Sequence, residues 1–162
     1  MYNVAIIGAG PAGIWAAVEI RKLKPDWKVV LIEKGEKIEK RKCLLREGWE
    51  KCPTCKKCGL LCGWGGAGAF SDGKLTLTPD VGGHLVDYMS RDKVEDLISY
   101  SDQLYLDFGA TEEVFGTDLK TYKELEREAV LAELKLVYSP VRHLGTERSL
   151  DVLKNMQDYL AE

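Results

Sequence analysis

The chain has 162 residues, of which 45% are hydrophobic and 30% are charged, the mixture of an ordinary globular domain. Its net charge of −3 argues against binding to nucleic acid or to an anionic membrane, and no apolar run is long enough to cross a bilayer. The N-terminus lacks the basic stretch and the cleavage site of a signal peptide, so we expect a cytoplasmic protein.

The N-terminal residues have the pattern strand, glycine-rich turn, helix, strand. Apolar strands are expected over 2–7 and 28–32, with a helix over 14–24 between them. The turn before the helix carries the motif G-x-G-x-x-G, formed by Gly8, Gly10 and Gly13. Such glycines allow a tight turn, the close approach of a pyrophosphate, and close packing of the helix on the strand. The pattern predicts a dinucleotide-binding unit, and the alternative is a glycine-rich turn that merely packs.

Glu33 follows the second strand, about twenty residues after Gly13. A carboxylate at this place can accept hydrogen bonds from both ribose hydroxyls and disfavours a 2′-phosphate, so NADP is the least expected ligand. The motif alone does not separate FAD from NAD. The residues that we expect to bind the cofactor in this unit are Gly8, Gly10, Pro11, Ala12, Gly13, Glu33 and Lys34.

The highly charged segment 34–42 is expected to be a solvated turn and the start of a helix. Arg41 is the exception, because a cation just past the second strand can reach the cofactor phosphates.

All five cysteines lie between residues 43 and 62. Cys52, Cys55, Cys58 and Cys62 have the spacing C-x2-C-x2-C-x3-C, which is typical of ligands to a [4Fe–4S] cluster. Cys43 is an alternative ligand, and a glycine stands where such runs usually continue with proline. The same spacing also suits zinc, a redox disulfide or free thiols under a loop.

A glycine- and alanine-rich stretch follows at residues 63–74. Only backbone covers such a surface, so it can lie flat against a planar ring or a phosphate chain. The alternative is a linker, but linkers are usually polar and this stretch carries Trp64 and Phe70. An edge strand is expected over 74–78.

The rest of the chain is expected to be mostly helical. Helices are predicted from residue 90 to 108, from 118 to about 133, and from 146 or 149 to 160, with one strand at 134–138. In the second of these helices Leu119, Tyr122, Leu125, Ala129 and Ala132 are expected to face inward.

Residues 142–146 lie between the expected strand and the last helix, where α/β folds place residues that face ligands. His143 is a weak candidate for a catalytic acid or base, since histidine titrates near neutral pH, although a lone histidine is more often structural. His84 is a weaker candidate still.

The segments GAGPAG, GWGGAGAFSDGKL and RHLGTERS, together with Glu33, resemble a widespread family of FAD-dependent dehydrogenases. That family is related to geranylgeranyl reductases and to the glutathione-reductase-like flavoproteins. The resemblance covers most of this chain but only the N-terminal part of such proteins. It implies FAD, with the diphosphate on residues 8–13 and the adenosine ribose on Glu33. It also implies that Gly65, Gly66, Ala67, Gly68 and Ser71 line the flavin side, whereas the cysteine run is not part of it.

We therefore expect an α/β protein, with a Rossmann-like FAD/NAD(P)-binding βαβ unit, an incomplete parallel sheet, added helices and a Cys/Gly-rich insertion. Residues 1–162 would form a single, partial domain, divided into 1–42 (βαβ), 43–80 (Cys/Gly-rich) and 81–162 (helical, with one strand).

The expected function is the FAD-binding portion of a flavin-dependent oxidoreductase, with a [4Fe–4S] cluster that exchanges single electrons with the flavin. The alternatives are a non-enzymatic iron–sulfur or zinc module, an NAD-dependent dehydrogenase fragment, and an inert truncation product. The expected partners are a small-molecule redox substrate or electron carrier, and a second subunit or missing C-terminal half that completes the sheet.

Overall fold

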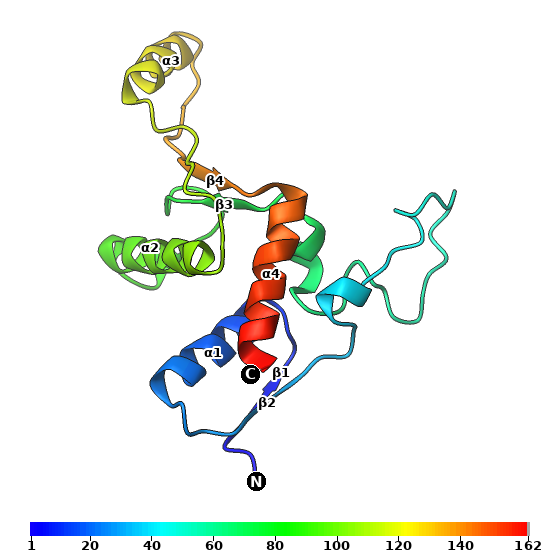
Figure 1. Cartoon of the computed structure of the whole chain (residues 1–162). Coiled ribbons are helices and arrows are strands. Elements are labelled where there is room, and N and C mark those ends of the chain that lie inside the picture. Colours follow the sequence, from blue (N-terminus) through cyan, green and yellow to red (C-terminus); the bar gives the residue numbers. More distant parts are fainter. Residues whose placement is uncertain (162) are drawn as a thin grey trace. The chain divides into compact units, whose positions relative to one another are not determined.

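The structure is a computed structural model that describes residues 1–161 (Figure 1). The chain divides into two compact units. Unit 1 comprises Met1–Gly73 together with the residues from Thr146 onward, and unit 2 comprises Lys74–Gly145.

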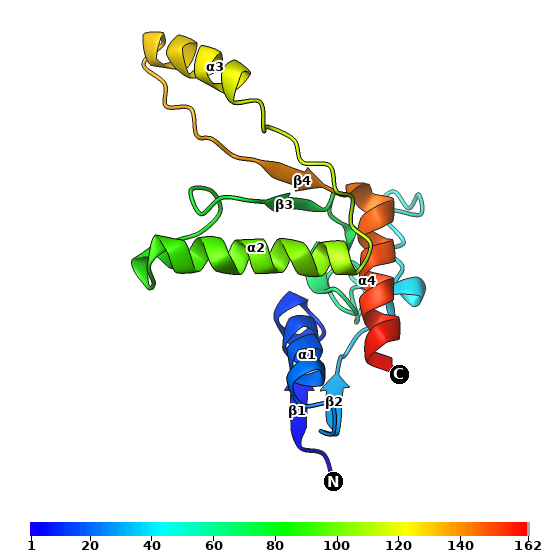
Figure 2. The same ribbon diagram turned by 60° about the vertical axis from the view of Figure 1, so that its left-hand side comes forward.

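Unit 1 begins with the strand–helix–strand pattern that the sequence predicts. Strand β1 spans Val4–Ile7, helix α1 spans Pro11–Leu23 and strand β2 spans Val29–Ile32. The two strands run parallel, in register from Val4 opposite Val29 to Ile7 opposite Ile32. Helix α1 packs beside both strands (Figure 2) and buries Ile14, Ala17 and Val18, which its periodicity predicts to face the sheet together with Ile20. Ile20 is only half-buried. A mixed α/β fold of the Rossmann-like type is thereby confirmed.

Helix α4, Gly145–Ala161, is the last element, and all of it from Thr146 belongs to unit 1. Near its middle, the carbonyl of Leu153 accepts a hydrogen bond of 2.7 Å from the indole Nε1 of Trp64, which lies well after β2 in the chain. Near its end, the ring of Tyr159 lies 4.5 Å from the guanidinium of Arg21, close to the end of α1. Because α1 runs back from the carboxyl end of the strands to their amino end, these contacts place α4 antiparallel to β2. Its buried residues are Ser149, Val152, Met156 and Gln157.

Unit 2 contains a second, antiparallel pair of strands and two helices. Strand β3 spans Lys74–Thr76 and strand β4 spans Val141–His143, with Leu75 opposite Arg142. Helix α2, Arg91–Asp107, lies alongside this pair in Figures 1 and 2. Helix α3, Leu119–Leu131, begins after Asp118, whose carboxylate caps it by accepting the N–H of Lys120 at 2.9 Å. The expected edge strand and the three expected helices are thus present.

The strand predicted over 134–138 is wrong. Those residues are irregular, and the strand lies a few residues later, in β4. Pro140 does not end a strand but precedes one, and its carbonyl accepts a hydrogen bond of 2.9 Å from the N–H of Leu77. The register is fixed by Arg142, which is buried in an ion pair with Asp102 of α2. A tertiary contact therefore selects the strand, against the local apolar pattern.

The predicted inward face of α3 is also wrong. None of the helix residues is buried, and Leu119, Leu125 and Leu131 are 56%, 50% and 87% exposed. The apolar periodicity of α3 shows that the helix has an apolar side but not that a surface covers it. In the part of the chain that the structure describes, no helix is long and apolar enough to cross a membrane.

Candidate cofactor site

The glycine-rich turn leads from β1 into a helix start that is open to a ligand. A Cβ on Gly13 would lie 2.0 Å from the carbonyl oxygen of Gly8, so only glycine lets α1 approach the strand this closely. Gly10 is the N-cap of α1 and supplies no side-chain cap, and a Cβ on it would meet nothing within 4 Å. Pro11 and Ala12 are exposed. The first turn of α1 therefore presents free backbone N–H groups and the positive end of the helix dipole to open space, the arrangement that binds phosphate.

Glu33 lies where the sequence predicts it, and its carboxylate already has partners. Its Oε2 accepts a hydrogen bond of 2.8 Å from the N–H of Ala9. Its Oε1 accepts bonds of 2.9 Å from the N–H groups of Gly35 and Gly63. Burial raises the pKa of Glu33, but these three bonds and Lys34 outweigh it and hold the pKa below its ordinary value of 4.5. Glu33 thus ties the glycine-rich turn, the end of β2 and the second glycine-rich stretch together.

The second glycine-rich stretch packs directly on the first. The N–H of Gly65 donates a hydrogen bond of 2.8 Å to the carbonyl of Ala9, and a Cβ on Gly66 would lie 3.2 Å from Cα of Gly10. Residues Gly66–Phe70 form a short 3₁₀ helix, in which Ala67 and Gly68 are exposed. The structure therefore brings together the two segments that the sequence assigns to the cofactor. Whether they contact the flavin stays a prediction, as it does for the exposed Ser71 and Lys34.

Arg41 is buried inside the loop that joins these segments. Its guanidinium donates hydrogen bonds of 2.6 to 3.0 Å to main-chain carbonyls and lies 4.8 Å from the centroid of the Phe70 ring. Burial lowers the pKa of Arg41, while the negative charges of Glu33 and of the Cys62 and Cys58 thiolates act in the opposite direction. The carbonyls that it binds belong to Gly59, Leu60, Trp64 and Gly66. Arg41 shapes the loop in this structure, and its predicted contact with cofactor phosphates stays a prediction.

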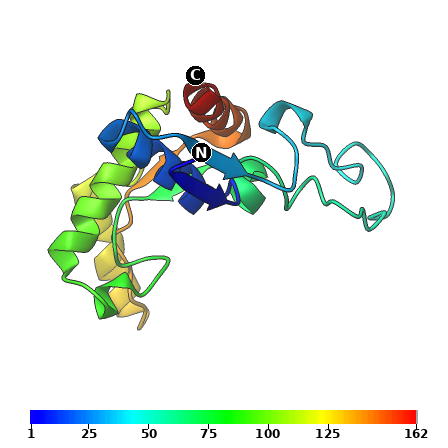
Figure 3. The same cartoon turned by 90° about the horizontal axis from the view of Figure 1, so that it is seen from below.

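The cysteines lie on an extended loop, drawn in cyan in Figure 3, that leads away from β1 and β2. All are free thiols, with Cys52 and Cys55 exposed and Cys43, Cys58 and Cys62 half-buried. Among residues 1–161, no three histidine, cysteine, aspartate or glutamate side chains gather closely enough to hold a metal ion. The structure therefore does not support the predicted metal site.

In unit 2, Arg142 and His143 have opposite environments. Arg142 is 4% exposed and donates from Nη2 to Asp102 at 2.7 Å and from Nη1 to the carbonyl of Thr111. His143 is exposed, and its ring meets that of Phe115 edge to face, with the centroids 6.3 Å apart. The sequence predicts that residues 142–146 follow a strand and precede a helix, whereas Arg142 and His143 lie within β4 and Gly145 begins α4. The catalytic role of His143 stays a prediction, and exposed His84 gains no further support.

Two structural roles in this site were missed by sequence reasoning. The sequence predicts that Glu33 and Arg41 both contact the cofactor, whereas in the structure each also binds backbone groups that hold the two glycine-rich segments together. Backbone N–H and C=O groups occur at almost every residue, so a bond to them leaves no pattern in the sequence. The glycines themselves are one signal of this role in the sequence. A Cβ on Gly63 would lie 2.7 Å from Cδ of Arg41, so only glycine fits beside that side chain.

The chain is similar to a known family of oxidoreductases over most of its length. The model of the pyridine nucleotide-disulphide oxidoreductase family matches residues 2–126. An uncharacterized protein of Clostridium beijerinckii (strain ATCC 51743 / NCIMB 8052) is 39% identical over 71 residues. That match covers 44% of this chain and 13% of the relative, so the chain matches only a small part of that protein. No solved structure matches the chain.

Proposed function

Because this chain belongs to the pyridine nucleotide-disulphide oxidoreductase family, we propose that it is the FAD-binding portion of a flavin-dependent dehydrogenase. The observation that carries the proposal is the uncapped start of α1, with the backbone of Gly65 and Gly66 packed against its glycine turn. When bound, FAD would supply the redox chemistry of the enzyme. A small-molecule redox substrate or electron carrier would exchange electrons with it.

The residues of this chain would bind and orient the cofactor. The N–H groups in the first turn of α1 would hold the diphosphate, and the space beside Gly10 would admit it. The exposed backbone of Ala67 and Gly68 would lie toward the flavin ring, with no side chain large enough to keep the ring away. This glycine-rich surface favours FAD over NAD as the ligand, since a Rossmann unit that binds NAD needs only the first glycine motif.

Glu33 would receive the adenosine ribose, at the expense of its present bonds. Its Oε1 now accepts two backbone N–H groups and its Oε2 accepts one. A carboxylate oxygen offers about two lone pairs, so Oε2 keeps one acceptor site while Oε1 is filled. One ribose hydroxyl would therefore bind Oε2 directly, and a second would displace an N–H group of Gly35 or Gly63.

The test is titration of the purified chain with FAD, NAD⁺ and NADP⁺, followed by the fluorescence of the flavin and of the protein. We expect FAD to bind and the two nicotinamide cofactors to bind at least tenfold more weakly. Gly10→Val places a side chain in the open space where the diphosphate would lie, and its backbone suits valine, so we expect at least tenfold weaker FAD binding with the fold kept. Gly83→Ala, whose new Cβ also meets nothing within 4 Å, is the matched control in unit 2.

Binding of NAD⁺ without FAD would replace the proposal by that of an NAD-dependent dehydrogenase fragment. Equal FAD affinity of Gly10→Val and the wild type would refute the assignment of this turn to the diphosphate. Binding of no cofactor by a folded chain would leave the inert fragment or the non-enzymatic module as the better account.

The iron–sulfur part of the sequence prediction stays a prediction. Among the residues that the structure describes, the cysteines do not lie close enough together to bind one metal ion, so the proposed function does not include electron transfer through them. Free thiols at all five positions are the state that cytosolic reductants maintain, and we propose the cytoplasm as the location. Iron, acid-labile sulfide and zinc analysis of protein purified without oxygen tests the metal: iron with sulfide would support a cluster, zinc would replace it, and absence of all three would refute both.

A further inference from the structure

The loop that carries the cysteines is strongly basic. Residues 40–57, which we call the basic loop, contain seven lysines or arginines and two glutamates, so their net charge is +5. The whole chain carries −3, so the remaining residues carry −8. Arg41 is buried, and the other charged residues of the loop are exposed. Positive charge is therefore concentrated on one exposed segment of an otherwise acidic chain. The exposed cations are Lys40, Lys42, Arg46, Lys51, Lys56 and Lys57.

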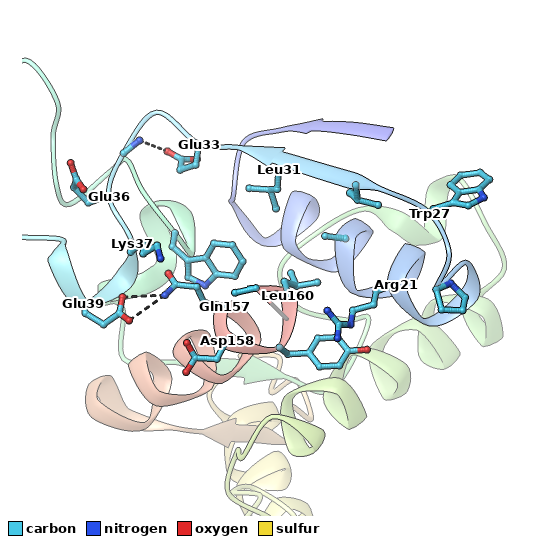
Figure 4. A pocket seen from close by; sticks show the side chains of 17 residues that line it. Arg21, Trp27, Leu31, Glu33, Glu36, Lys37, Glu39, Gln157, Asp158 and Leu160 are labelled. Carbon is cyan, nitrogen blue, oxygen red and sulfur yellow. Dashed lines mark hydrogen bonds between the residues drawn. The ribbon is translucent and has the colours of Figure 1, made fainter. Parts of the chain in front are cut away.

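The basic loop is fixed at its base and lies against the candidate cofactor site. Just before it, the side chain of Gln157 in α4 donates to the carboxylate of Glu39 at 3.1 Å (Figure 4). Within it, Arg41 donates hydrogen bonds to carbonyls of the second glycine-rich stretch, and Arg46 lies 5.2 Å from the centroid of Phe70 in that stretch. A molecule that docks on the basic loop would thus lie beside the segment that we propose to face the flavin.

Two large apolar side chains are exposed among these cations. Leu45 is 45% exposed and Trp49 is 55% exposed. The N–H of Trp49 donates a hydrogen bond of 3.2 Å to the carbonyl of Leu44, and that of Glu47 donates one of 3.1 Å to the carbonyl of Cys43. Residues 43–49 are therefore folded into compact turns. Protein interfaces are enriched in tryptophan and arginine and surround an apolar centre with a polar rim. The basic loop has this composition.

The charge distribution favours a compact acidic protein as the partner. Nucleic acid and anionic membranes are also polyanions, but both extend well beyond a segment of this size and would meet the acidic remainder of the chain. A small acidic protein can match the loop alone. Electron-transfer proteins bind through small, weak interfaces, and complementary charge steers such encounters.

We propose that the basic loop docks a small acidic electron-transfer protein, with Trp49 at the centre of the interface and Lys51, Lys56 and Lys57 at its rim. This protein would be the electron carrier of the proposed enzyme. The choice of an electron carrier rests on the proposed function, whereas the docking of an acidic protein on the loop does not.

The experiment titrates the full chain with plant-type [2Fe–2S] ferredoxin and with flavodoxin, two small acidic carriers, and measures binding by calorimetry. We expect at least one of them to bind in about 50 mM salt and to bind at least tenfold more weakly in about 300 mM salt, because salt screens the charges. Cytochrome c, a basic carrier, should not bind. Trp49→Ala should weaken binding by a similar factor at both salt concentrations, as the loss of an apolar anchor does.

Charge reversal tests whether binding depends on the loop itself. The loop variant replaces three of its exposed lysines by glutamate: Lys51→Glu, Lys56→Glu and Lys57→Glu. We expect it to bind the carrier at least tenfold more weakly than the wild type. The matched control makes the same change in net charge on three exposed lysines of unit 2: Lys93→Glu, Lys120→Glu and Lys123→Glu. We expect the control to bind within about threefold of the wild type, because most of its new charges lie beyond the screening length.

Equal carrier affinities of the loop variant and the control would overturn the proposal, as would failure of both acidic carriers to bind at low salt. Titration with oligothymidylate and with phosphatidylserine vesicles covers the other polyanions. If either binds and the acidic carriers do not, the proposal is overturned. FAD binding is measured on the same proteins, since the loop variant keeps every residue assigned to the cofactor. Loss of carrier binding with FAD binding kept would support the proposal, whereas carrier binding by a chain that binds no FAD would overturn the electron-transfer role.

Discussion

Replacing Arg41 by methionine tests whether one buried cation organises the cofactor loop. Arg41 is 5% exposed, and its guanidinium donates to four main-chain carbonyls at distances of 2.6 to 3.0 Å. Hydrogen bonds of a charged group contribute about 1.5–3 kcal/mol each, but removal of the cation also removes its cost of burial. We expect Arg41→Met to lower the free energy of unfolding by about 3–5 kcal/mol, because it leaves four main-chain carbonyls without this donor, at about 1–3 kcal/mol for each one that stays buried and unpaired.

Arg46 provides a matched control, since it also stacks on Phe70, with its guanidinium 5.2 Å from the ring centroid, but is exposed. We expect Arg46→Met to cost less than about 1 kcal/mol, the value of an exposed cation–π contact. Arg41→Lys should lose most of the same stability, because an ammonium group cannot reach carbonyls on several sides at once. Urea unfolding followed by tryptophan fluorescence measures all three variants. Equal midpoints for Arg41→Met and Arg46→Met would refute the reasoning.

Three further predictions concern the packing and the charges. Gly13→Ala should lower the free energy of unfolding by about 2–3 kcal/mol in calorimetry, because its Cβ would lie 2.0 Å from the carbonyl oxygen of Gly8. An unchanged melting temperature would contradict this close contact. The lowered pKa of Glu33 contributes stability above its ordinary value of 4.5, and this is lost as pH falls through the lower folded-state pKa. Urea midpoints between pH 6 and pH 3 should therefore fall more steeply for the wild type than for Glu33→Gln, and equal slopes would contradict it. Asp102→Ala leaves the buried Arg142 without its carboxylate and should lower the free energy of unfolding in urea by about 3–5 kcal/mol. Adding Arg142→Met should recover part of this stability. If it recovers none, the ion pair is not the cause of the loss.

The parts of the fold that follow from local chemistry were predictable from the sequence. The order β1, α1, β2 follows from two apolar runs, the glycines between them and the periodicity of α1. The start of α3 follows from Asp118, whose carboxylate caps it. The place of Glu33 follows from its distance to the glycine motif. In each case the determining residues are close together in the chain.

The parts that depend on distant residues were not predictable. Strand β4 begins at Val141, where Arg142 can reach Asp102, and nothing near 141 in the sequence records that partner. The exposure of the apolar side of α3 was not predictable either, since the apolar pattern of a helix does not specify whether another part of the protein covers it. The carbonyls that Arg41 binds are equally invisible, because every residue has one. The gathering of the thiols, expected from spacing, is absent among the described residues because spacing does not fix loop shape.

The hydrogen bond between Trp64 and Leu153 also has a consequence for the order of folding. It joins the glycine-rich loop to a residue 89 positions later, and Gln157 likewise accepts the N–H of Ile38 at 3.2 Å. During synthesis the N-terminal strands and α1 leave the ribosome long before α4 does. The loop beside the glycine turn is therefore expected to reach its final conformation only after α4 has been made. Contacts of such wide separation also slow folding, so cofactor binding should be among the last steps.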